Sequence, residues 1–139
     1  MREYRNGDAL RVLVQRAQED EFSDGCAGFD RVGLYTLLGD DGSVLAVFGV
    51  CFSAEGVADC YALIAQAAGR KLLEAVRFLL REIPPFMRRK KLKQMRMTVK
   101  KDFMAGRRFA QMIGFCAADV LPKFYKENDY QLFERIEKW

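Results

Sequence analysis

One stretch near the C-terminus decides the fold, and it reads Phe103-Met104-Ala105-Gly106-Arg107-Arg108-Phe109-Ala110-Gln111-Met112-Ile113-Gly114-Phe115. Asp102 precedes it and can cap a helix, whose inward positions are then Phe103, Phe109, Met112 and Ile113. Gly114 ends this helix, because glycine readily adopts the left-handed backbone of a C-terminal cap. The stretch therefore predicts a helix that runs directly into a strand.

Strands are predicted on both sides of this helix. Before it, Met95, Met97 and Val99 alternate with the polar residues Arg96, Thr98 and Lys100, which is typical of a strand with one wet face. After it, Phe115–Leu121 and Tyr130–Ile136 are expected to close the chain as two strands, separated by Pro122 and the turn residues 127–129.

The middle of the chain predicts three antiparallel strands. Val32–Leu38 and Val44–Phe52 are apolar runs joined by Gly39-Asp40-Asp41-Gly42-Ser43, whose Asp-Gly pair favours a hairpin turn. A short break at residues 53–56 leads to a third run, Val57–Ile64. The second run is apolar at nearly every position, as expected of a strand covered on both faces.

Two more helices and a short strand complete the prediction. Residues 1–5 can form a strand, and Asn6-Gly7-Asp8 supplies a turn and an N-cap for a helix that carries Leu10, Leu13, Val14 and Ala17, with an irregular segment at Phe22–Phe29. From Ala67 a longer helix places on one face Leu72, Leu73, Val76, Leu79, Leu80 and Ile83. Pro84-Pro85 is expected to stop it.

The order of elements predicts an α/β protein of the α+β type, with a mixed sheet of about seven strands flanked by helices. A chain of 139 residues, half of them hydrophobic, suits one domain over residues 1–139. It has no apolar run long enough to cross a bilayer, and its first residues lack a signal-peptide core, so we expect a cytoplasmic protein without membrane contact.

Composition excludes several kinds of active site. The sequence contains no histidine, which excludes Ser-His-Asp and Cys-His nucleophile systems and disfavours a catalytic zinc ion. The cysteines show no Cys-x-x-Cys spacing, so we expect small, buried, reduced thiols at Cys26, Cys51, Cys60 and Cys116.

The net charge of +4 is concentrated in one region. Ten Lys and Arg residues lie between Arg88 and Arg108, against the single acidic residue Asp102. Such a block indicates either an anionic partner, such as nucleic acid, a phosphate-rich cofactor or an acidic protein, or a solvated surface. Nucleic acid is not favoured, because only Phe86 and Phe103 flank the block as stacking platforms.

This order of elements resembles the GNAT superfamily of acyl-CoA N-acyltransferases. In that family a segment of the type N-x-x-A-x-x-x-Y-x-K-x-G-F runs from helix into strand, and residues 103–115 lie over it with the Gly-Phe anchor at Gly114-Phe115. Asn128–Arg135 is similar to the family's closing strand. The resemblance extends more weakly to acyltransferase-like proteins of tailed bacteriophages.

The resemblance implies acetyl-CoA as cofactor. The family binds the pyrophosphate of coenzyme A at R/Q-x-x-G-x-G/A before the long helix, where the helix N-terminus meets the phosphates. The matching residues here are Gln66, Ala67, Ala68, Gly69, Arg70 and Lys71, after Leu63 and Ile64 of the preceding strand. Lys71 replaces a small residue and either crowds the phosphates or adds charge to them; the hexapeptide can also be a simple helix cap. Arg107 or Arg108 is expected near the 3′-phosphate.

The resemblance also shows a catalytic departure. Ala110 stands where many members have the tyrosine that protonates the leaving thiolate, and Phe103 stands at the usual asparagine. Candidate acids are Tyr125, Tyr61 and Cys60, and candidate bases are Asp59 and Glu55.

The leading prediction is therefore an N-acetyltransferase that acts on a primary amine of an unknown acceptor, either a small molecule or a protein. The alternative is a GNAT-fold protein that has lost catalysis and serves as a phage-related binding or structural protein. The sequence does not reveal the oligomeric state.

Overall fold

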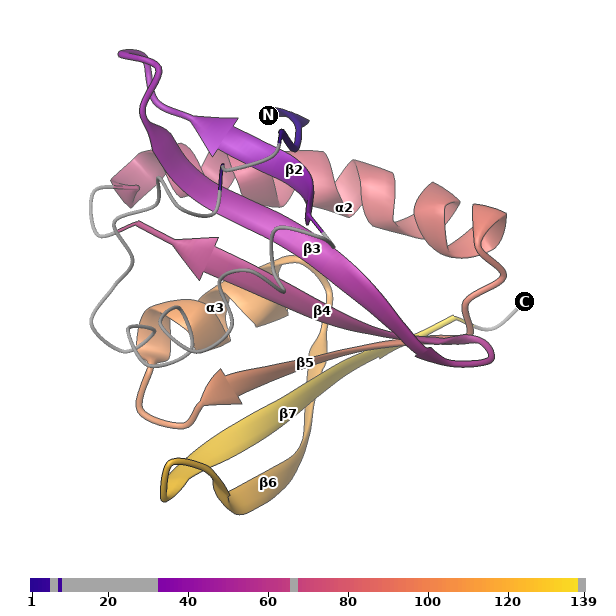
Figure 1. The fold of residues 1–139 in the computed structure, drawn as a ribbon. Coiled ribbons are helices and arrows are strands. Elements are labelled where there is room, and N and C mark those ends of the chain that lie inside the picture. The colour runs from indigo at the N-terminus through magenta and orange to yellow at the C-terminus, as the bar shows by residue number, and fades with distance from the viewer. Residues whose placement is uncertain (6–7, 9–32, 66–67, 138–139) are drawn as a thin grey trace. The chain divides into compact units, whose positions relative to one another are not determined.

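The computed structural model describes residues 1–5, 8, 33–65 and 68–137 (Figure 1). The predicted helix around Leu10–Ala17, the segment Phe22–Phe29 and Cys26 lie outside the described residues. The strands, in chain order, are β1 (Arg2–Glu3), β2 (Gly33–Leu38), β3 (Val44–Ala54), β4 (Val57–Ile64), β5 (Gln94–Lys100), β6 (Cys116–Tyr125) and β7 (Asn128–Ile136). They form one seven-stranded sheet in the order β1-β2-β3-β4-β5-β7-β6. The prediction of a mixed sheet of about seven strands is confirmed, since β4 and β5 are parallel while β1 with β2, β5 with β7 and β6 with β7 are antiparallel.

Contacts divide the chain into two compact units. The first unit comprises Met1–Cys51 and Tyr61–Ala75, and the second comprises Phe52–Cys60 and Val76–Trp139. In the first unit, β2 and β3 form the predicted hairpin, whose turn is closed by the Gly39 N–H donating to the Ser43 carbonyl at 2.8 Å. Gly42 has φ +83° in this turn, the conformation that the Asp-Gly pair predicted. The core of this unit gathers Val44, Val47, Leu63 and Ala65.

A buried ion pair ties the start of the first unit to β2. The carboxylate of Asp8 is 1% exposed and accepts hydrogen bonds from Arg2 Nη1 at 2.7 Å and Nη2 at 3.0 Å. It also accepts from the Arg5 N–H at 2.9 Å and from Thr36 Oγ1 at 2.6 Å. Burial raises the pKa of Asp8, but these hydrogen bonds outweigh burial and lower it to about 2. The carboxylate predicted as a helix cap is thus the centre of a charged network.

In the second unit, β5 has β4 and β7 as neighbours. β4 runs parallel to β5 from Val57 opposite Gln94 to Cys60 opposite Met97. The predicted alternation along β5 is confirmed, because Met95, Met97 and Val99 are buried. Helix α3 (Met104–Met112) contacts β5 and β6.

The long helix corrects one prediction. The short 3-10 helix η3 (Gly69–Lys71) leads into α2 (Leu72–Arg89), which continues through Pro84 and Pro85 instead of stopping there. A proline inside a helix costs about 3 kcal/mol or more. The next turn, however, buries Phe86 and Met87, and this burial offsets part of that cost. Leu73 and Leu80, predicted on the inner face, are 42% and 43% exposed.

Helix α3 confirms its predicted end but not its predicted start. Its N-cap is Phe103, without a side-chain hydrogen bond, so Asp102 does not cap it as expected. Of the four predicted inward residues, Met112 is 44% exposed and Ala110 is buried in its place. Gly114 has φ +95°, and the N–H groups of Gly114 and Phe115 donate to the carbonyls of Gln111 and Ala110. These two bonds form a Schellman motif, as the glycine predicted.

The last two strands are longer than predicted. β6 runs through Pro122 to Tyr125, which is possible because β6 is an edge strand and needs no partner on one side. The turn then falls at Lys126 and Glu127, both with positive φ, so Asn128 and Asp129 belong to β7.

Candidate functional site

The start of α2 carries the predicted pyrophosphate-binding residues. Gln66 and Ala67 lie outside the described residues, whereas Ala68 is buried and Gly69 and Arg70 are exposed. Gly69 has φ +50°, and a Cβ added there would meet nothing within 4 Å. Leu63 and Ile64 bury their side chains at the end of β4, so these side chains cannot contact a ligand. The exposed glycine at this helix start leaves room for the backbone to meet a phosphate group.

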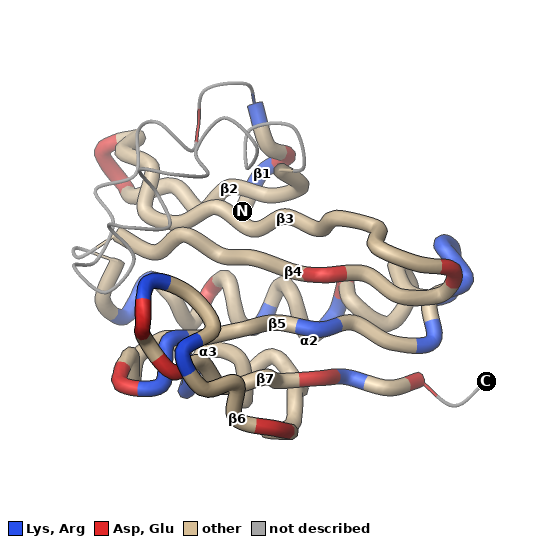
Figure 2. Tube along the Cα trace, turned by 60° about the horizontal axis from the view of Figure 1, so that its bottom comes forward, with Lys and Arg blue, Asp and Glu red and all other residues tan. Residues whose placement is uncertain are grey.

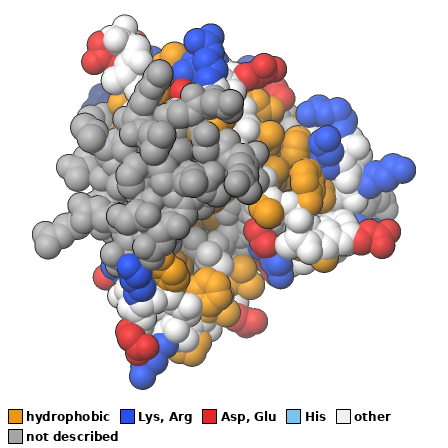
Figure 3. Space-filling view, viewed as in Figure 1, with side chains coloured by type: hydrophobic (Ala, Val, Ile, Leu, Met, Phe, Trp, Pro, Cys, Tyr) orange, Lys and Arg blue, Asp and Glu red, His pale blue; other side chains and the backbone are white. Residues whose placement is uncertain are grey.

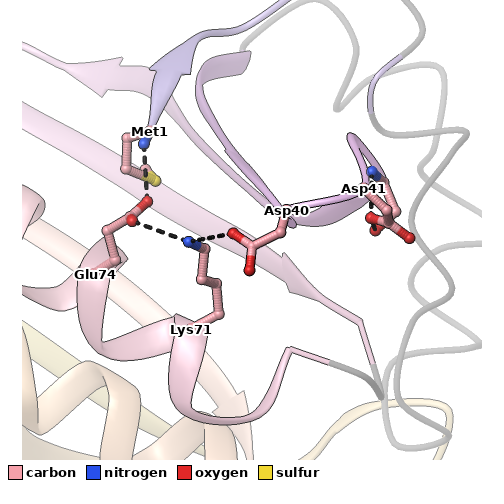
Figure 4. A network of polar contacts seen from close by, with 6 residues as sticks. Met1, Asp40, Asp41, Lys71 and Glu74 are labelled. Atoms are coloured by element: carbon pink, nitrogen blue, oxygen red, sulfur yellow. Dashed lines mark hydrogen bonds and ion pairs between the residues drawn. The ribbon is translucent and has the colours of Figure 1, made fainter.

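Lys71 is held by carboxylates. Its Nζ lies 3.3 Å from Asp40 Oδ1 of the β2–β3 turn and 3.4 Å from Glu74 Oε1 of α2 (Figure 4). Glu74 in turn accepts from the amine of Met1 at 3.1 Å. Hydrogen bonds to Asp40 and then Glu74 raise the pKa of Lys71. The hydrogen bond from the Met1 amine lowers the pKa of Glu74. The structure therefore places Lys71 in a matched charge network at the start of α2.

The predicted base Asp59 is also paired. Both of its oxygens accept from Arg96 of β5, at 2.9 Å from Nε and 3.3 Å from Nη2. Figure 2 shows the acidic segment of β4 beside the basic segment of β5. Arg96 Nη2 additionally contacts Ser53 Oγ at 3.3 Å, and the Asp59 side chain remains 47% exposed. The other candidate, Glu55, is exposed in the β3–β4 turn.

The predicted acids differ in their surroundings. Tyr61 is half-buried, and its ring lies directly over Gly49, where an added Cβ would come within 2.4 Å of the phenol oxygen. Tyr125 is half-buried at the end of β6 and makes an edge contact with Tyr130, their ring centroids 6.4 Å apart. Cys60 is buried, and burial strongly raises the pKa of its thiol, which makes it a poor acid.

The cysteines depart from expectation elsewhere. Cys51 and Cys116 are exposed, so the prediction of buried thiols is wrong for both; like Cys60, they are free. Among the described residues, no group of three His, Cys, Asp or Glu side chains could hold a metal ion. In the same part of the chain, no helix is both long and apolar enough to cross a membrane.

A basic pocket lies in the second unit. Its volume is about 420 Å³, and its lining comprises Lys100, Lys101, Asp102, Arg107, Asn128 and Asp129. The segment after β5 and the start of β7 meet here, since the Lys101 N–H donates to the Asp129 carbonyl at 2.9 Å. Arg107 Nη1 donates to the Lys101 carbonyl at 3.1 Å. We call this site the basic pocket.

The two predicted groups of cofactor residues belong to different units. Ala68–Lys71 belong to the first unit, Arg107 lines the basic pocket of the second unit, and Arg108 is exposed on α3. Sequence reasoning singled out the basic block that supplies Lys100, Lys101 and Arg107. It missed Asn128 and Asp129, because only the fold brings β7 beside β5.

Comparison with protein families finds no family model that matches the sequence. No curated protein matches it either. Solved structures do match. An acetyltransferase of the GNAT family from Bacillus anthracis has a TM-score of 0.71 at 11% identity, with 97% of this chain and 92% of that chain covered. A mutant of the spermidine N-acetyltransferase SpeG from Vibrio cholerae has a TM-score of 0.64 at 12% identity, with 97% and 93% covered.

A third structure, the microcin self immunity acetyltransferase MccE in complex with acetyl-CoA and AMP, has a TM-score of 0.57 at 16% identity. It covers 68% of this chain and 56% of that chain. These likenesses, at identities below 20%, concern the fold. The chain therefore has the fold of the GNAT acyl-CoA N-acyltransferases.

Proposed function

We propose that this protein is an N-acetyltransferase that moves the acetyl group of acetyl-CoA to a primary amine. The observation that carries the proposal is the likeness to a GNAT acetyltransferase over 97% of the chain. Two other similar structures support the proposal. SpeG is named a spermidine N-acetyltransferase, and MccE is an acetyltransferase in complex with acetyl-CoA. A cytoplasmic location and a phage origin remain predictions from the sequence.

The start of α2 fits the pyrophosphate of coenzyme A. Gly69 is exposed with a positive φ, and the space that a Cβ would occupy is open. The backbone at Gly69 and Arg70 would hold the pyrophosphate, because the N–H groups of Ala68 and Lys71 already donate to the carbonyls of Ala65 and Ala68. Arg108 is the candidate for the 3′-phosphate. When bound, acetyl-CoA supplies the acetyl group as a reactive thioester.

Acetyl transfer requires this chain to accept a proton from the amine and to return one to the leaving sulfur. We assign the first role to Asp59 and the second to Tyr61 or Tyr125. The two hydrogen bonds from Arg96 fix the position of the Asp59 carboxylate. The side chain of Ala110 has no proton to give, so the acid must come from elsewhere. Asp59→Asn should lower kcat by about 100-fold with acetyl-CoA binding unchanged. One of Tyr61→Phe and Tyr125→Phe should have the same effect, and that variant identifies the acid.

The test separates binding from transfer. Calorimetric titration with acetyl-CoA comes first, followed by measurement of free thiol released in the presence of single amines, including spermidine. We expect saturable binding and amine-dependent thiol release. An absence of binding at millimolar acetyl-CoA would overturn the proposal. Binding without thiol release for any amine would favour the alternative, a GNAT-fold protein that has lost catalysis.

A further inference from the structure

The basic pocket has an unusual combination of charges for a surface hollow. Three cationic side chains, from Lys100, Lys101 and Arg107, share its lining with the carboxylates of Asp102 and Asp129. None of the ion pairs formed among the described residues involves these three cations. We propose that the pocket binds a small molecule that carries both a phosphate or carboxylate group and an ammonium group.

The orientation of Arg107 and its position in α3 suit the cationic side of the pocket to an oxyanion. The guanidinium of Arg107 donates one N–H to the Lys101 carbonyl, which fixes its orientation. An arginine has five N–H donors, so others remain for a ligand. Arg107 lies in the first turn of α3, whose N-cap makes no side-chain hydrogen bond and whose first turn contains no acidic residue. The partial positive charge of this helix end therefore adds to that of the side chains.

The acidic side of the pocket argues against a simple anion. Asp102 is exposed beside Lys101, and Asp129 is half-buried. Among the described residues, only one carboxylate oxygen of Asp129 is engaged, Oδ1, which accepts from the Lys123 N–H at 3.0 Å. An anion alone would be repelled by both carboxylates, whereas an ammonium group on the same ligand would be attracted to them. Figure 3 shows Lys and Arg side chains close to Asp and Glu side chains at the lower left of the face in view.

The size of the pocket suits a small molecule, because a volume of about 420 Å³ lies within the usual range for ligand sites. The backbone frame is stiffened by hydrogen bonds from the Lys101 N–H to the Asp129 carbonyl and from the Phe103 N–H to the Lys100 carbonyl. These bonds use main-chain atoms only. Substitution of the Lys100 or Lys101 side chain should therefore leave the frame intact.

The experiment compares three probes on the full chain by isothermal titration calorimetry. O-Phosphoethanolamine carries both charges, inorganic phosphate carries only the anion, and ethanolamine carries only the ammonium group. We expect O-phosphoethanolamine to bind about tenfold more tightly than either of the others. Lys101→Gln should weaken it about tenfold, whereas Lys90→Gln, which removes the same charge from an exposed turn outside the pocket, should not. β-Alanine carries an ammonium group and a carboxylate, so it tests whether the anionic group of the ligand can be a carboxylate instead of a phosphate.

Asp102→Asn gives the sharpest result, because the two probes should respond in opposite directions. This variant should weaken O-phosphoethanolamine and strengthen inorganic phosphate. The proposal is overturned if inorganic phosphate binds as tightly as O-phosphoethanolamine, or if Lys90→Gln and Lys101→Gln have equal effects. It is also overturned if Lys101→Gln weakens coenzyme A but not dephospho-coenzyme A, since the pocket would then hold the 3′-phosphate. None of these measurements requires acetyl transfer, so the proposed function and this proposal can fail independently.

Discussion

The start of α2 and the basic pocket are both rich in positive charge, but their cations have different partners. Lys71 lies within 3.4 Å of carboxylate oxygens from Asp40 and Glu74. Among the described residues, no ion pair engages Lys100, Lys101 or Arg107. A phosphate at α2 would therefore depend on backbone N–H groups and on the exposed Arg70, whereas an anion in the basic pocket can depend on three cationic side chains. Carboxylate partners thus reduce the free positive charge at the start of α2 by that of Lys71.

The largest expected effect concerns the most buried matched pair, Arg2 with Asp8. Asp8→Asn leaves the Arg2 guanidinium without its counterion, and breaking a buried pair in this way costs about 3–5 kcal/mol of unfolding free energy. Urea denaturation measures the loss. Asp40→Asn is the control, because its side chain is 98% exposed and its removal should leave stability unchanged. Equal losses in the two variants would show that burial does not distinguish the matched pairs.

The same pair predicts a dependence of stability on pH. The pKa of Asp8 is lowered from 3.8 to about 2 in the folded protein, so the unfolded chain binds this proton more readily. The stabilisation is therefore complete above about pH 5 and is lost as the pH falls through 3.8 towards 2, a change of about 2 kcal/mol. Urea denaturation of the wild type and Asp8→Asn at pH 5 and pH 2 should show their stabilities converging at the lower pH. A constant difference would contradict the assignment.

A smaller effect is expected where the coenzyme is proposed to bind. Gly69→Ala places a methyl group in the open space at the start of α2 and should weaken acetyl-CoA by about tenfold, since the phosphates approach the backbone there. Gly42→Ala is a matched control. It also has a positive φ and open space around an added Cβ, but it lies in the β2–β3 turn. Calorimetry measures both affinities, and similar losses would indicate backbone strain instead of ligand contact.

Local patterns predicted much of the fold. The alternation of Met95, Met97 and Val99 predicted β5, and Gly114 predicted the end of α3, because strand periodicity and cap geometry depend on neighbouring residues. Pro84 and Pro85 misled the prediction of α2. The burial of Phe86 and Met87, a tertiary effect, overrides the local preference of proline.

The candidate sites were harder to predict than the fold. Lys71 was recognised as a departure in the pyrophosphate-binding motif, but one of its partners, Asp40, lies 31 positions away in the β2–β3 turn. The contacts of Tyr61 and Arg96 likewise depend on neighbouring strands. The ring of Tyr61 lies over Gly49, and Arg96 forms an ion pair with Asp59. Charge is visible in the sequence, whereas the pairing of charges depends on the tertiary structure.

The smallest effect tests that pairing directly. Asp40→Asn removes one of the two carboxylates that hold Lys71, which frees the ammonium group for an anionic ligand and removes a repulsive charge. Because Asp40 is 98% exposed, we expect only a two- to fivefold gain in acetyl-CoA affinity, about what exposed ion pairs contribute. The gain should shrink at high salt, which screens exposed charges. Asp119→Asn removes the same charge from an exposed position in the second unit and should give no gain. If both variants bind acetyl-CoA equally more tightly, net charge and not the release of Lys71 accounts for the change, and the contrast between the two basic sites would lose its physical basis.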